Sequence, residues 1–534
     1  MKLQSQNVLV CTLICGLFAL STAATAKNFS ASCSNVSLLG SILRAQCQDS
    51  TGAKHYSVID INYVLANKFG KFRWQSNGFF YKSARYCRID DFAYLTCDLA
   101  NGRGGWASAI TNLNSHLTNI GGNLVSDIAS SSAQTLHLLK TSGTRIVDST
   151  QGTPVQLRGV NLGGLFVMEF WMTPMVTSTH QDTQPKDSYS LIKTLDGRFG
   201  VAQERELIRA YQHTWITQND LQIIKNRGLN VIRVPIWYGQ FYPVDHVSND
   251  SFRSDAFDDL DRIVNAAASV GLYVILDMHG VVGGQSCSDT TGHRGPSASE
   301  DGTGRPCVGT TDTNRFWSNP SDQGNTQWLW WQIANHYKYN YTIAGYDLIN
   351  EPSGASSKTQ VWNAYNDLYK SIRSVDFQHI IFMEGAYGGP GHWNWDSLPD
   401  PATYKWKNVV YEMHEYQWNG SSSDVRRGAT RQVDDFKRHQ SWNVPGYIGE
   451  FNIMTGTADD WADSVRQYDN AGLSWTMWTY KSSNGPVPNP WGWFDTNLTG
   501  WMPNVYTDSA EWIRKDWEMW TTPKSFTENT HFQF

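Results

Sequence analysis

Short apolar segments that end in polar residues alternate with longer segments from about residue 155 onward. The longer segments at residues 217–228 and 256–271 carry apolar residues at helical spacing and end in Gly, as helices often do. Strands that alternate with helices are typical of parallel βαβ units. The pattern predicts eight strands, at residues 155–161, 230–236, 273–279, 346–351, 380–385, 409–416, 447–451 and 474–480.

Eight such units over nearly 400 residues favour an α/β fold of the closed (β/α)₈ TIM-barrel type. An open, doubly wound sheet is the alternative. It is less favoured because no Gly-rich phosphate loop follows the first predicted strand, and neither a Walker A motif nor a G-x-S-x-G elbow occurs. We therefore expect the carboxyl ends of the strands to meet on one face.

Polar and aromatic residues gather at those strand ends. Buried charge is costly there unless the groups pair or function. A lone His or Arg is more often structural, but nine such residues on one rim indicate a site. These residues are Arg233, His279, Asn350, Glu351, Glu384, His414, Tyr416, Glu450 and Trp478.

Two of the carboxylates, Glu351 and Glu450, lie at the ends of the fourth and seventh predicted strands and would face each other across a barrel mouth. A retaining glycosidase needs two carboxyl groups about 5–5.5 Å apart, one protonated to release the leaving group and one ionised to attack the sugar. The pair therefore suits cleavage of an acetal. Glu384, Glu412 and Glu415 are rival carboxylates, but none lies in a recognisable catalytic tripeptide.

The motif "LINEP" contains Glu351 and "IGEF" contains Glu450, and further characteristic segments lie at residues 158–174, 213–236, 276–280 and 478–484. With these motifs, residues 142–520 resemble glycoside hydrolase family 5, and within it the exo-β-1,3-glucanase branch. The resemblance implies a retaining β-glucanase with Glu351 as acid/base and Glu450 as nucleophile. This chemistry needs two carboxyl groups and water, so no cofactor is expected.

The two glutamates need different protonation states. A nearby Arg233 and a hydrogen bond from Tyr416 would favour the ionised form of Glu450. Glu351 must hold its proton near neutral pH, and burial together with the charge of Glu450 would raise its pKa.

Further residues are expected to bind the substrate. Asn350 would bind the sugar 2-hydroxyl, His279 and His414 would hold neighbouring hydroxyls or the nucleophile, and Trp478 would form the floor of the pocket. The resemblance adds Glu169 as a substrate-binding carboxylate. The expected substrate-binding set is thus Glu169, Arg233, His279, Asn350, His414, Tyr416 and Trp478.

A repeat precedes the barrel. Residues 60–72 and 112–124 share the pattern [DN]-[IL]-N-x-x-L-x-N-x-x-G-x-[FL] at an offset of 52 residues, and each follows a pair of cysteines. A duplicated unit is therefore expected. The segments "FSASCSNVSLLGSILRAQCQD", "IDINYVLANKFGKFRWQ" and "HLTNIGGNL" make residues 28–125 resemble the cyanovirin-N homology (CVNH) lectins, a small β-rich fold.

That resemblance implies two polar sugar pockets. One would contain Ser32, Gln48, Ser50 and Asn119, and the other Asn67, Gln75 and Asn77. The alternative is that these side chains only cap turns. Residues 126–141 follow as a linker that begins Ser-rich, and residues 521–534 as a C-terminal tail.

The first 26 residues contain Lys2, an apolar run at residues 8–20 and Ala-Thr-Ala at 24–26, which is typical of a secretory signal. The run is shorter than a membrane-spanning helix needs, so a membrane anchor is disfavoured. We expect a secreted or periplasmic protein without stable membrane insertion.

Six cysteines follow this segment, and an even number in an oxidising compartment predicts disulfides. The sequential pairing is the simplest of fifteen. No Cys-x-x-Cys or clustered Cys/His spacing predicts a metal site. The sequential pairs are Cys33 with Cys47, Cys87 with Cys97, and Cys287 with Cys307.

Composition and charge limit the classes of molecule that the protein is expected to bind. The chain has 40% hydrophobic residues and a net charge of -6, which gives no electrostatic basis for binding nucleic acid or an anionic membrane. The 24 Trp and 24 Tyr suit sugars, although most of these rings are expected in the core. A polysaccharide or oligosaccharide is the expected partner, and a monomer the favoured state.

Three functions stay open. An exported retaining β-glucanase with a lectin-like domain is favoured, and a non-catalytic carbohydrate-binding protein is disfavoured because both glutamates keep their full motifs. A hydrolase of the same family acting on mannan or a glycolipid headgroup is the third. The long loops at residues 280–307 and 414–424 leave exo or endo action and the linkage open.

Overall fold

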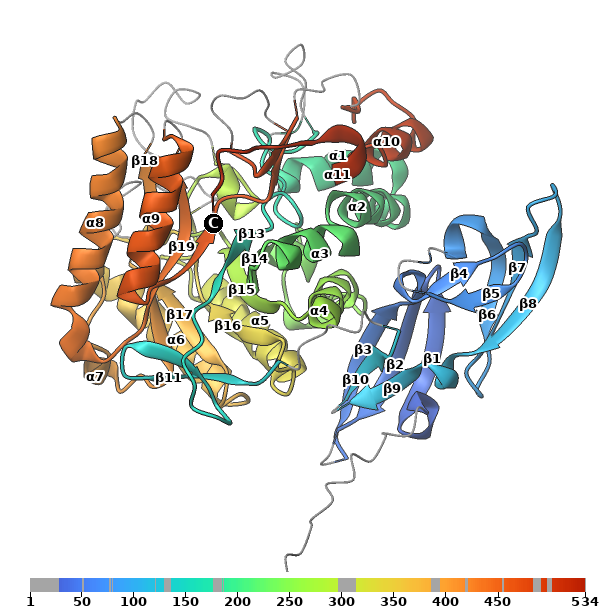
Figure 1. Cartoon of the computed structure of the whole chain (residues 1–534), viewed down its shortest axis with the longest axis horizontal. Helices are drawn as coiled ribbons and strands as arrows, with labels where there is room; N and C mark the ends of the chain where they lie inside the picture. The colour runs from blue at the N-terminus through green and yellow to red at the C-terminus, as the bar shows by residue number, and fades with distance from the viewer. Residues whose placement is uncertain are drawn as a thin grey trace, which may run out of the picture.

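The structure is a computed structural model, in which a small β-rich body and a larger α/β body are formed by successive parts of the chain (Figure 1). The predicted signal at residues 1–26, and Ser50, Asn77 and Cys307, lie outside the described residues. The described residues are 28–49, 52–75, 78, 80–120, 122–128, 136–175, 185, 187–295, 314–385, 394–417, 421–453, 456–483, 491–496 and 502–533.

The larger body confirms the predicted (β/α)₈ barrel. Its parallel strands close in the order of the sequence, and each overlaps one predicted strand. They are β13 (Arg158–Asn161), β14 (Val231–Trp237), β15 (Tyr273–Gly280), β16 (Ile343–Asp347), β17 (Ile380–Glu384), β18 (Val409–Gln417), β19 (Gly446–Ile453) and β20 (Ser474–Met477).

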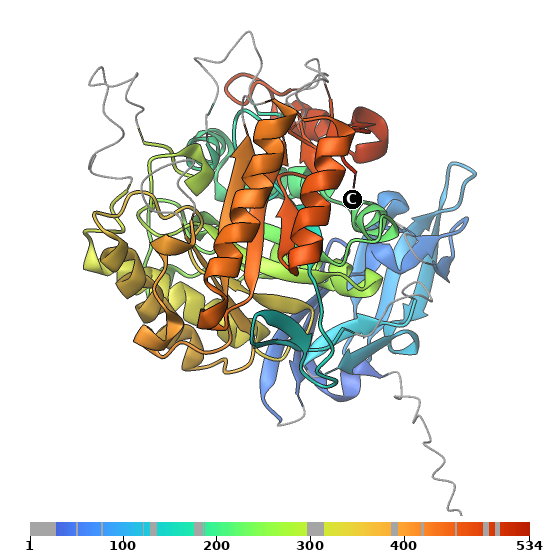
Figure 2. The same cartoon turned by 60° about the vertical axis from the view of Figure 1, so that its left-hand side comes forward.

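Helices surround the strands, and the two predicted helices are present as α3 and α4 (Figure 2). The side chain of Thr217 caps the start of α3, and α4 ends at Gly271 with a positive φ of 72°, which suits glycine. The helices are α1 (Ser188–Phe199), α2 (Val201–Trp215), α3 (Gln218–Asn226), α4 (Asp258–Val270), α5 (Pro320–Tyr337), α6 (Lys358–Arg373), α7 (Pro401–Tyr404), α8 (Ser422–Arg438), α9 (Ala458–Ala471), α10 (Ala510–Trp517) and α11 (Thr522–Ser525). Among the described residues, no helix has both the length and the apolar character needed to cross a membrane.

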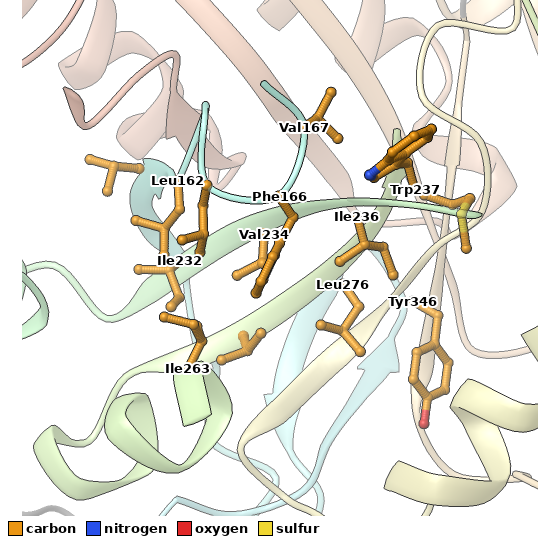
Figure 3. Close-up of a cluster of buried hydrophobic side chains, with 14 of the residues drawn as sticks. Leu162, Phe166, Val167, Ile232, Val234, Ile236, Trp237, Ile263, Leu276 and Tyr346 are labelled. Atoms are coloured by element: carbon orange, nitrogen blue, oxygen red, sulfur yellow. The ribbon is translucent and has the colours of Figure 1, made fainter. Parts of the chain in front are cut away.

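Alternation along β14 decides which side chains enter the barrel. Ile232, Val234 and Ile236 belong to the hydrophobic cluster between strands and helices, together with Ile263 of α4 (Figure 3). Successive strand residues point to opposite faces, so Arg233 lies inside the barrel. Its side chain is completely buried.

A hairpin packs against the barrel strands beneath the predicted site. It consists of β11 (Leu139–Ser142) and β12 (Arg145–Asp148), and Leu139 and Ile146 pack against barrel residues such as Phe382. The Thr141 amide donates a hydrogen bond of 2.7 Å to Asn408 Oδ1. The predicted linker, residues 126–141, therefore ends earlier than expected. Burial of Leu139 makes residues 139–141 part of the barrel domain.

The segment predicted as a tail, residues 521–534, also packs on the barrel. Its strand β23 (Thr527–Glu528) pairs with β22 (Phe494–Asp495), which itself pairs with β21 (Lys481–Ser482). Phe532 is buried, and its ring lies 4.5 Å from that of Trp461. Burial of these apolar side chains makes the described part of this segment structural.

The N-terminal body shows the predicted duplication. Each half has a three-stranded antiparallel sheet and a two-stranded one, and the disulfides Cys33–Cys47 and Cys87–Cys97 each join neighbouring strands. Cys287 is disulfide-bonded as well. The strands are β1 (Cys33–Leu39), β2 (Ile42–Gln48), β3 (Lys54–Asp60), β4 (Leu65–Asn67), β5 (Phe72–Trp74), β6 (Ala84–Ile89), β7 (Tyr94–Ala100), β8 (Trp106–Asn112), β9 (Leu117–Ile120) and β10 (Asn123–Ser126). Arg44 of β2 forms an ion pair with Asp258 at the start of α4.

Candidate active site

The carboxyl ends of the barrel strands bring the predicted rim residues into one connected group. Arg233 of β14 contacts Glu450 of β19, and His414 of β18 lies against Glu351, which follows β16. His279 of β15 stacks on Trp478, which follows β20. The residues come from strands far apart in the sequence, so closure of the barrel is what assembles the group.

Glu450 is held by two donors. Arg233 Nη1 donates to its Oε1 at 2.7 Å, and the Tyr416 hydroxyl donates to its Oε2 at 2.6 Å. The Glu450 side chain is 5% exposed. Hydrogen bonds from a cation and a hydroxyl favour an ionised carboxylate, and this is the state that a nucleophile requires.

Arg233 has more acidic partners than the sequence indicated. Besides Glu450 it lies 2.7 Å from Asp347, 3.1 Å from Asp277 and 3.4 Å from Glu412. Burial opposes its charge, but the four carboxyl groups outweigh burial and raise its pKa further. Burial raises the pKa values of Asp277 and Glu412 well above their usual range. Asp277 and Asp347 were missed, although each is a polar residue within an apolar strand.

Glu351 has a different environment. It follows β16 with a positive φ of 44°, its side chain is 23% exposed, and its Oε1 lies 3.0 Å from His414 Nδ1. Burial raises its pKa, although His279 and Arg233 oppose the shift. A carboxyl group with a raised pKa, on a side chain that still reaches solvent, suits a general acid.

The two glutamates share one neighbour. His414 Nδ1 lies 3.0 Å from Glu351 and 3.6 Å from Glu450. The two carboxyl groups are therefore close enough for the separation of about 5–5.5 Å that a covalent, retaining mechanism uses.

Both histidines of the site are neutral. Burial lowers the pKa of His279 to about 4 and that of His414 to about 3. Asp277 Oδ2 lies 2.5 Å from His279 Nδ1 and Glu412 Oε1 lies 3.4 Å from His414 Nε2, so each ring is oriented by a carboxyl group. Neutral, oriented imidazoles suit hydrogen bonds with sugar hydroxyls.

Several buried polar atoms near the two glutamates, or near Glu169, which acts electrostatically with both, have no partner within the described residues. Asn350 accepts a hydrogen bond from Arg233 at 3.0 Å, but its Nδ2 makes none. Glu169 accepts one from Trp171 at 2.8 Å, and its Oε1 is free. Asp289 has one buried oxygen without a partner, and burial raises its pKa to about 6. Sugar hydroxyls can satisfy such groups. Asp289 was missed because its loop has no regular pattern.

An aromatic surface completes the site. The rings of Trp478 and His279 are nearly parallel, with centroids 5.4 Å apart and an interplanar angle of 7°. Trp171 lies against Trp491, with centroids 4.6 Å apart. Such rings can contact the apolar face of a sugar.

The rival carboxylates lie in distinct places. Glu412 is inside the barrel, and Glu415 is bound by Arg431 at 2.7 Å. Glu384, Glu351 and His414 bring one donor atom each within 4.8 Å of one another, a group that can hold a metal ion. The acid–base chemistry described for Glu351 does not require one.

The residues predicted for sugar binding in the N-terminal domain include two that hold its fold. Asn119 Nδ2 donates to Ser32 Oγ and to the Gln48 carbonyl, and its Oδ1 accepts from Gly122. Asn67, at the equivalent position of the other repeat, donates to Ser83 and Ala100 and accepts from Gly70. Each asparagine therefore joins its repeat to the other one. Gln48 is exposed and Gln75 half-buried.

Comparison with known proteins agrees with this geometry. Residues 199–484 match the family described as Cellulase (glycosyl hydrolase family 5), and residues 29–125 match the CVNH domain. A "Beta-xylosidase" of Phanerodontia chrysosporium is 29% identical over 370 residues, which cover 64% of this chain and 70% of the relative. A "Probable glucan 1,3-beta-glucosidase A" of Aspergillus fumigatus is 23% identical over 403 residues, covering 66% of this chain and 88% of the relative.

Among solved structures, a MoCVNH3 variant in complex with (N-GlcNAc)4 is 27% identical, covers 18% of this chain and 96% of its own, and has a TM-score of 0.18. The family match spans more than half of the chain, and the closed barrel with its two glutamates is the fold expected of that family. The chain belongs to glycosyl hydrolase family 5 and carries a CVNH domain in front of its catalytic barrel.

Proposed function

We propose that this glycoside hydrolase cleaves β-glucan by a retaining, two-glutamate mechanism, and that it acts outside the cell. One observation carries the mechanism. Glu351 and Glu450 lie within 3.6 Å of the same His414 nitrogen, one with a raised pKa and the other held by Arg233 and Tyr416. The three disulfide-bonded regions support an oxidising compartment.

In the first step, Glu450 attacks the anomeric carbon while Glu351 transfers its proton to the leaving oxygen. The glycosidic bond breaks as the glycosyl ester to Glu450 forms. In the second step, Glu351 takes a proton from water, whose oxygen displaces Glu450 and restores both residues. Arg233 and Tyr416 stabilise the charge on Glu450 when it leaves the sugar.

A substrate panel tests the proposal. β-1,3-, β-1,4- and mixed-linkage glucans, mannan and glucosylceramide are each incubated with the enzyme, and NMR follows the anomeric configuration of the first product. Release of the β-anomer from a glucan is expected. An α-anomer as first product would contradict the retaining mechanism, and cleavage of mannan or glucosylceramide alone would contradict the glucan assignment.

A β-xyloside is the second candidate substrate. The relative named as a β-xylosidase is 29% identical to this chain, whereas the glucosidase relative is 23% identical. Xylose lacks the hydroxymethyl group of glucose. Comparing kcat/KM for aryl β-xylosides and aryl β-glucosides therefore measures which of the two sugars the pocket prefers.

Chelation is expected to leave the activity unchanged, because the proposed steps use only two carboxyl groups and water. Hydrolysis is measured before and after EDTA treatment, and again after Zn²⁺ is added back. Loss of activity on chelation that Zn²⁺ restores would mean that Glu351, Glu384 and His414 hold a catalytic ion.

The CVNH domain is proposed to bind glycan and so to raise the local concentration of the enzyme on a polymer. A shortened chain that begins at Leu136 is expected to keep its turnover on a short soluble oligosaccharide and to lose about tenfold or more on insoluble glucan. It retains the β11–β12 hairpin and the hydrogen bond of 2.9 Å from Tyr273 to the His137 carbonyl. Activity on both substrates is the measurement.

A structural role for the domain predicts a different result, in which the shortened chain is insoluble or unfolds at lower temperature. Arg44→Met in the full chain is the matched control, because it removes the ion pair with Asp258 and leaves the predicted sugar pockets intact. Absence of any affinity of the isolated domain on a broad glycan array would leave only the structural role.

A further inference from the structure

Glu384 is a buried carboxyl group beside the acid/base, and the mechanism above does not use it. It is the last residue of β17 and is 1% exposed. Its Oε2 accepts a hydrogen bond of 2.5 Å from the backbone N–H of Glu351. A backbone amide donates its one hydrogen to one main acceptor, so this bond accounts for the Glu351 N–H.

The backbone of Glu351 needs such support. Its φ of 44° lies in the left-handed region, which residues other than glycine seldom adopt. The preceding Asn350 is bonded through its amide to the Met278 carbonyl at 3.1 Å, and the following Pro352 has no N–H. The Glu351 carbonyl accepts a hydrogen bond of 2.6 Å from the Ser353 amide, within the turn itself. The bond to Glu384 is the contact that ties the Glu351 N–H to another strand of the barrel.

Glu384 is itself fixed by a helix. The hydroxyl of Tyr365, a fully buried residue of α6, donates to the Glu384 carbonyl at 2.9 Å and accepts from the Glu384 amide at 3.1 Å. The hydrogen bonds thus run from α6 through Glu384 to the backbone of the acid/base. Glu384 is thus bonded to Tyr365 through its backbone and to the Glu351 backbone through its side chain.

Charged and titratable groups face Glu384 from several strands. His414 Nδ1 lies 3.4 Å from its Oε1, and Glu351, Asp347, Glu412 and Arg233 act on it electrostatically. Burial, followed by the charge of Glu351, raises the pKa of Glu384 well above its usual range. The Glu384 Oε2 accepts the Glu351 N–H in either protonation state. Glutamine keeps a side-chain oxygen that can accept this bond, so it is the nearest mimic.

We propose that Glu384 is a positioning residue, which holds the backbone of Glu351 in its left-handed turn and thereby aims the acid/base at the leaving oxygen. The inference rests on the proposed function, because it takes Glu351 as the acid. It concerns the proton-transfer half of the reaction, since Arg233 and Tyr416, and not Glu384, contact the nucleophile.

The test compares two aryl β-glycosides in the full-length enzyme, of the sugar that the substrate panel identifies. Phenol is a poor leaving group that needs a proton, and 2,4-dinitrophenol is a good one that does not. Glu384→Leu is expected to lower kcat/KM about 10- to 100-fold for the phenyl substrate and less than about threefold for the dinitrophenyl substrate. Glu384→Gln should recover most of the phenyl activity.

Two variants keep the test decisive if Glu384→Leu fails to fold. Tyr365→Phe removes both hydrogen bonds to the Glu384 backbone and should show the same leaving-group dependence with a smaller loss. Glu415→Leu is the matched control, because Glu415 is a buried carboxylate that faces Arg431 and Gln432 instead of the site. It should affect both substrates equally.

Equal losses on the two substrates for Glu384→Leu and for Tyr365→Phe would overturn the proposal, as would a failure of Glu384→Gln to recover activity. Glu351→Gln is measured in parallel. If that variant shows no leaving-group dependence, Glu351 is not the acid and the proposed function fails. If it shows the dependence and the Glu384 variants do not, only the positioning role fails.

Discussion

Glu450→Ala is expected to reduce kcat on the order of 10⁴- to 10⁶-fold, because it removes the group that forms the covalent bond to the sugar. Sodium azide should restore turnover, since the anion fits the space of the missing carboxylate and attacks the same carbon. The product would then be a glycosyl azide of inverted configuration. Product analysis by NMR and rates with and without azide are the measurements.

The control for this variant is Glu415→Ala, which removes a carboxylate of the neighbouring strand β18 that is bound to Arg431 outside the site. It should keep activity and should not respond to azide. Full activity of Glu450→Ala, or an azide product of retained configuration, would contradict the role of Glu450 as nucleophile.

Arg233→Met is expected to lower the free energy of unfolding by about 3–5 kcal/mol and to abolish activity. The substitution leaves Asp347 and Glu450 without their cation in the barrel, beside Asp277 and Glu412. Methionine fills much of the arginine volume, so only a small cavity is expected. The loss of unfolding free energy therefore measures mainly the cost of burying carboxyl groups without their cation. Urea denaturation followed by fluorescence measures it.

Arg262→Met is the matched control for stability. Arg262 is 2% exposed, and it donates to the carbonyls of Ile216 and Gln212 at 3.1 and 3.2 Å. Its removal takes a donor from the Ile216 carbonyl, whereas the Gln212 carbonyl keeps the Ile216 amide at 3.3 Å. Within the described part of the chain no carboxyl group loses an ion-pair partner, so a loss of about 1–3 kcal/mol is expected. If Arg233→Met loses no more unfolding free energy than Arg262→Met, the buried carboxyl groups do not need the Arg233 guanidinium.

Much of the barrel and part of its site could be predicted from local patterns. Alternating strands and helices leave few ways to bury all their apolar faces, and a closed barrel then requires the strand ends to meet. Glu351 and Glu450 lie at the ends of predicted apolar strands and within motifs, so their sequence neighbourhoods indicated their positions. The N-terminal duplication was visible because Asn67 and Asn119 recur with their surrounding residues at the offset of 52 residues.

Other features depended on contacts between distant segments. Residues 126–141 are predicted to be a linker because the segment begins Ser-rich, and residues 521–534 are predicted to be a tail. Their apolar side chains are nevertheless buried, Leu139 against the barrel strands and Phe532 against Trp461. Asp289 lies in a long loop, and its relation to Glu169 follows only from how that loop packs.

The sequence by itself determined the fold class, the duplicated N-terminal domain and the positions of the two glutamates proposed to cleave an acetal, because each rests on periodicity or on residues adjacent in the chain. The tertiary structure decided what surrounds those glutamates. Arg233 meets carboxyl groups from four other strands, and Glu384 binds the backbone of Glu351 from the next strand. Burial and electrostatic coupling depend on distances in space. Residues far apart in the sequence come close together only when the barrel closes.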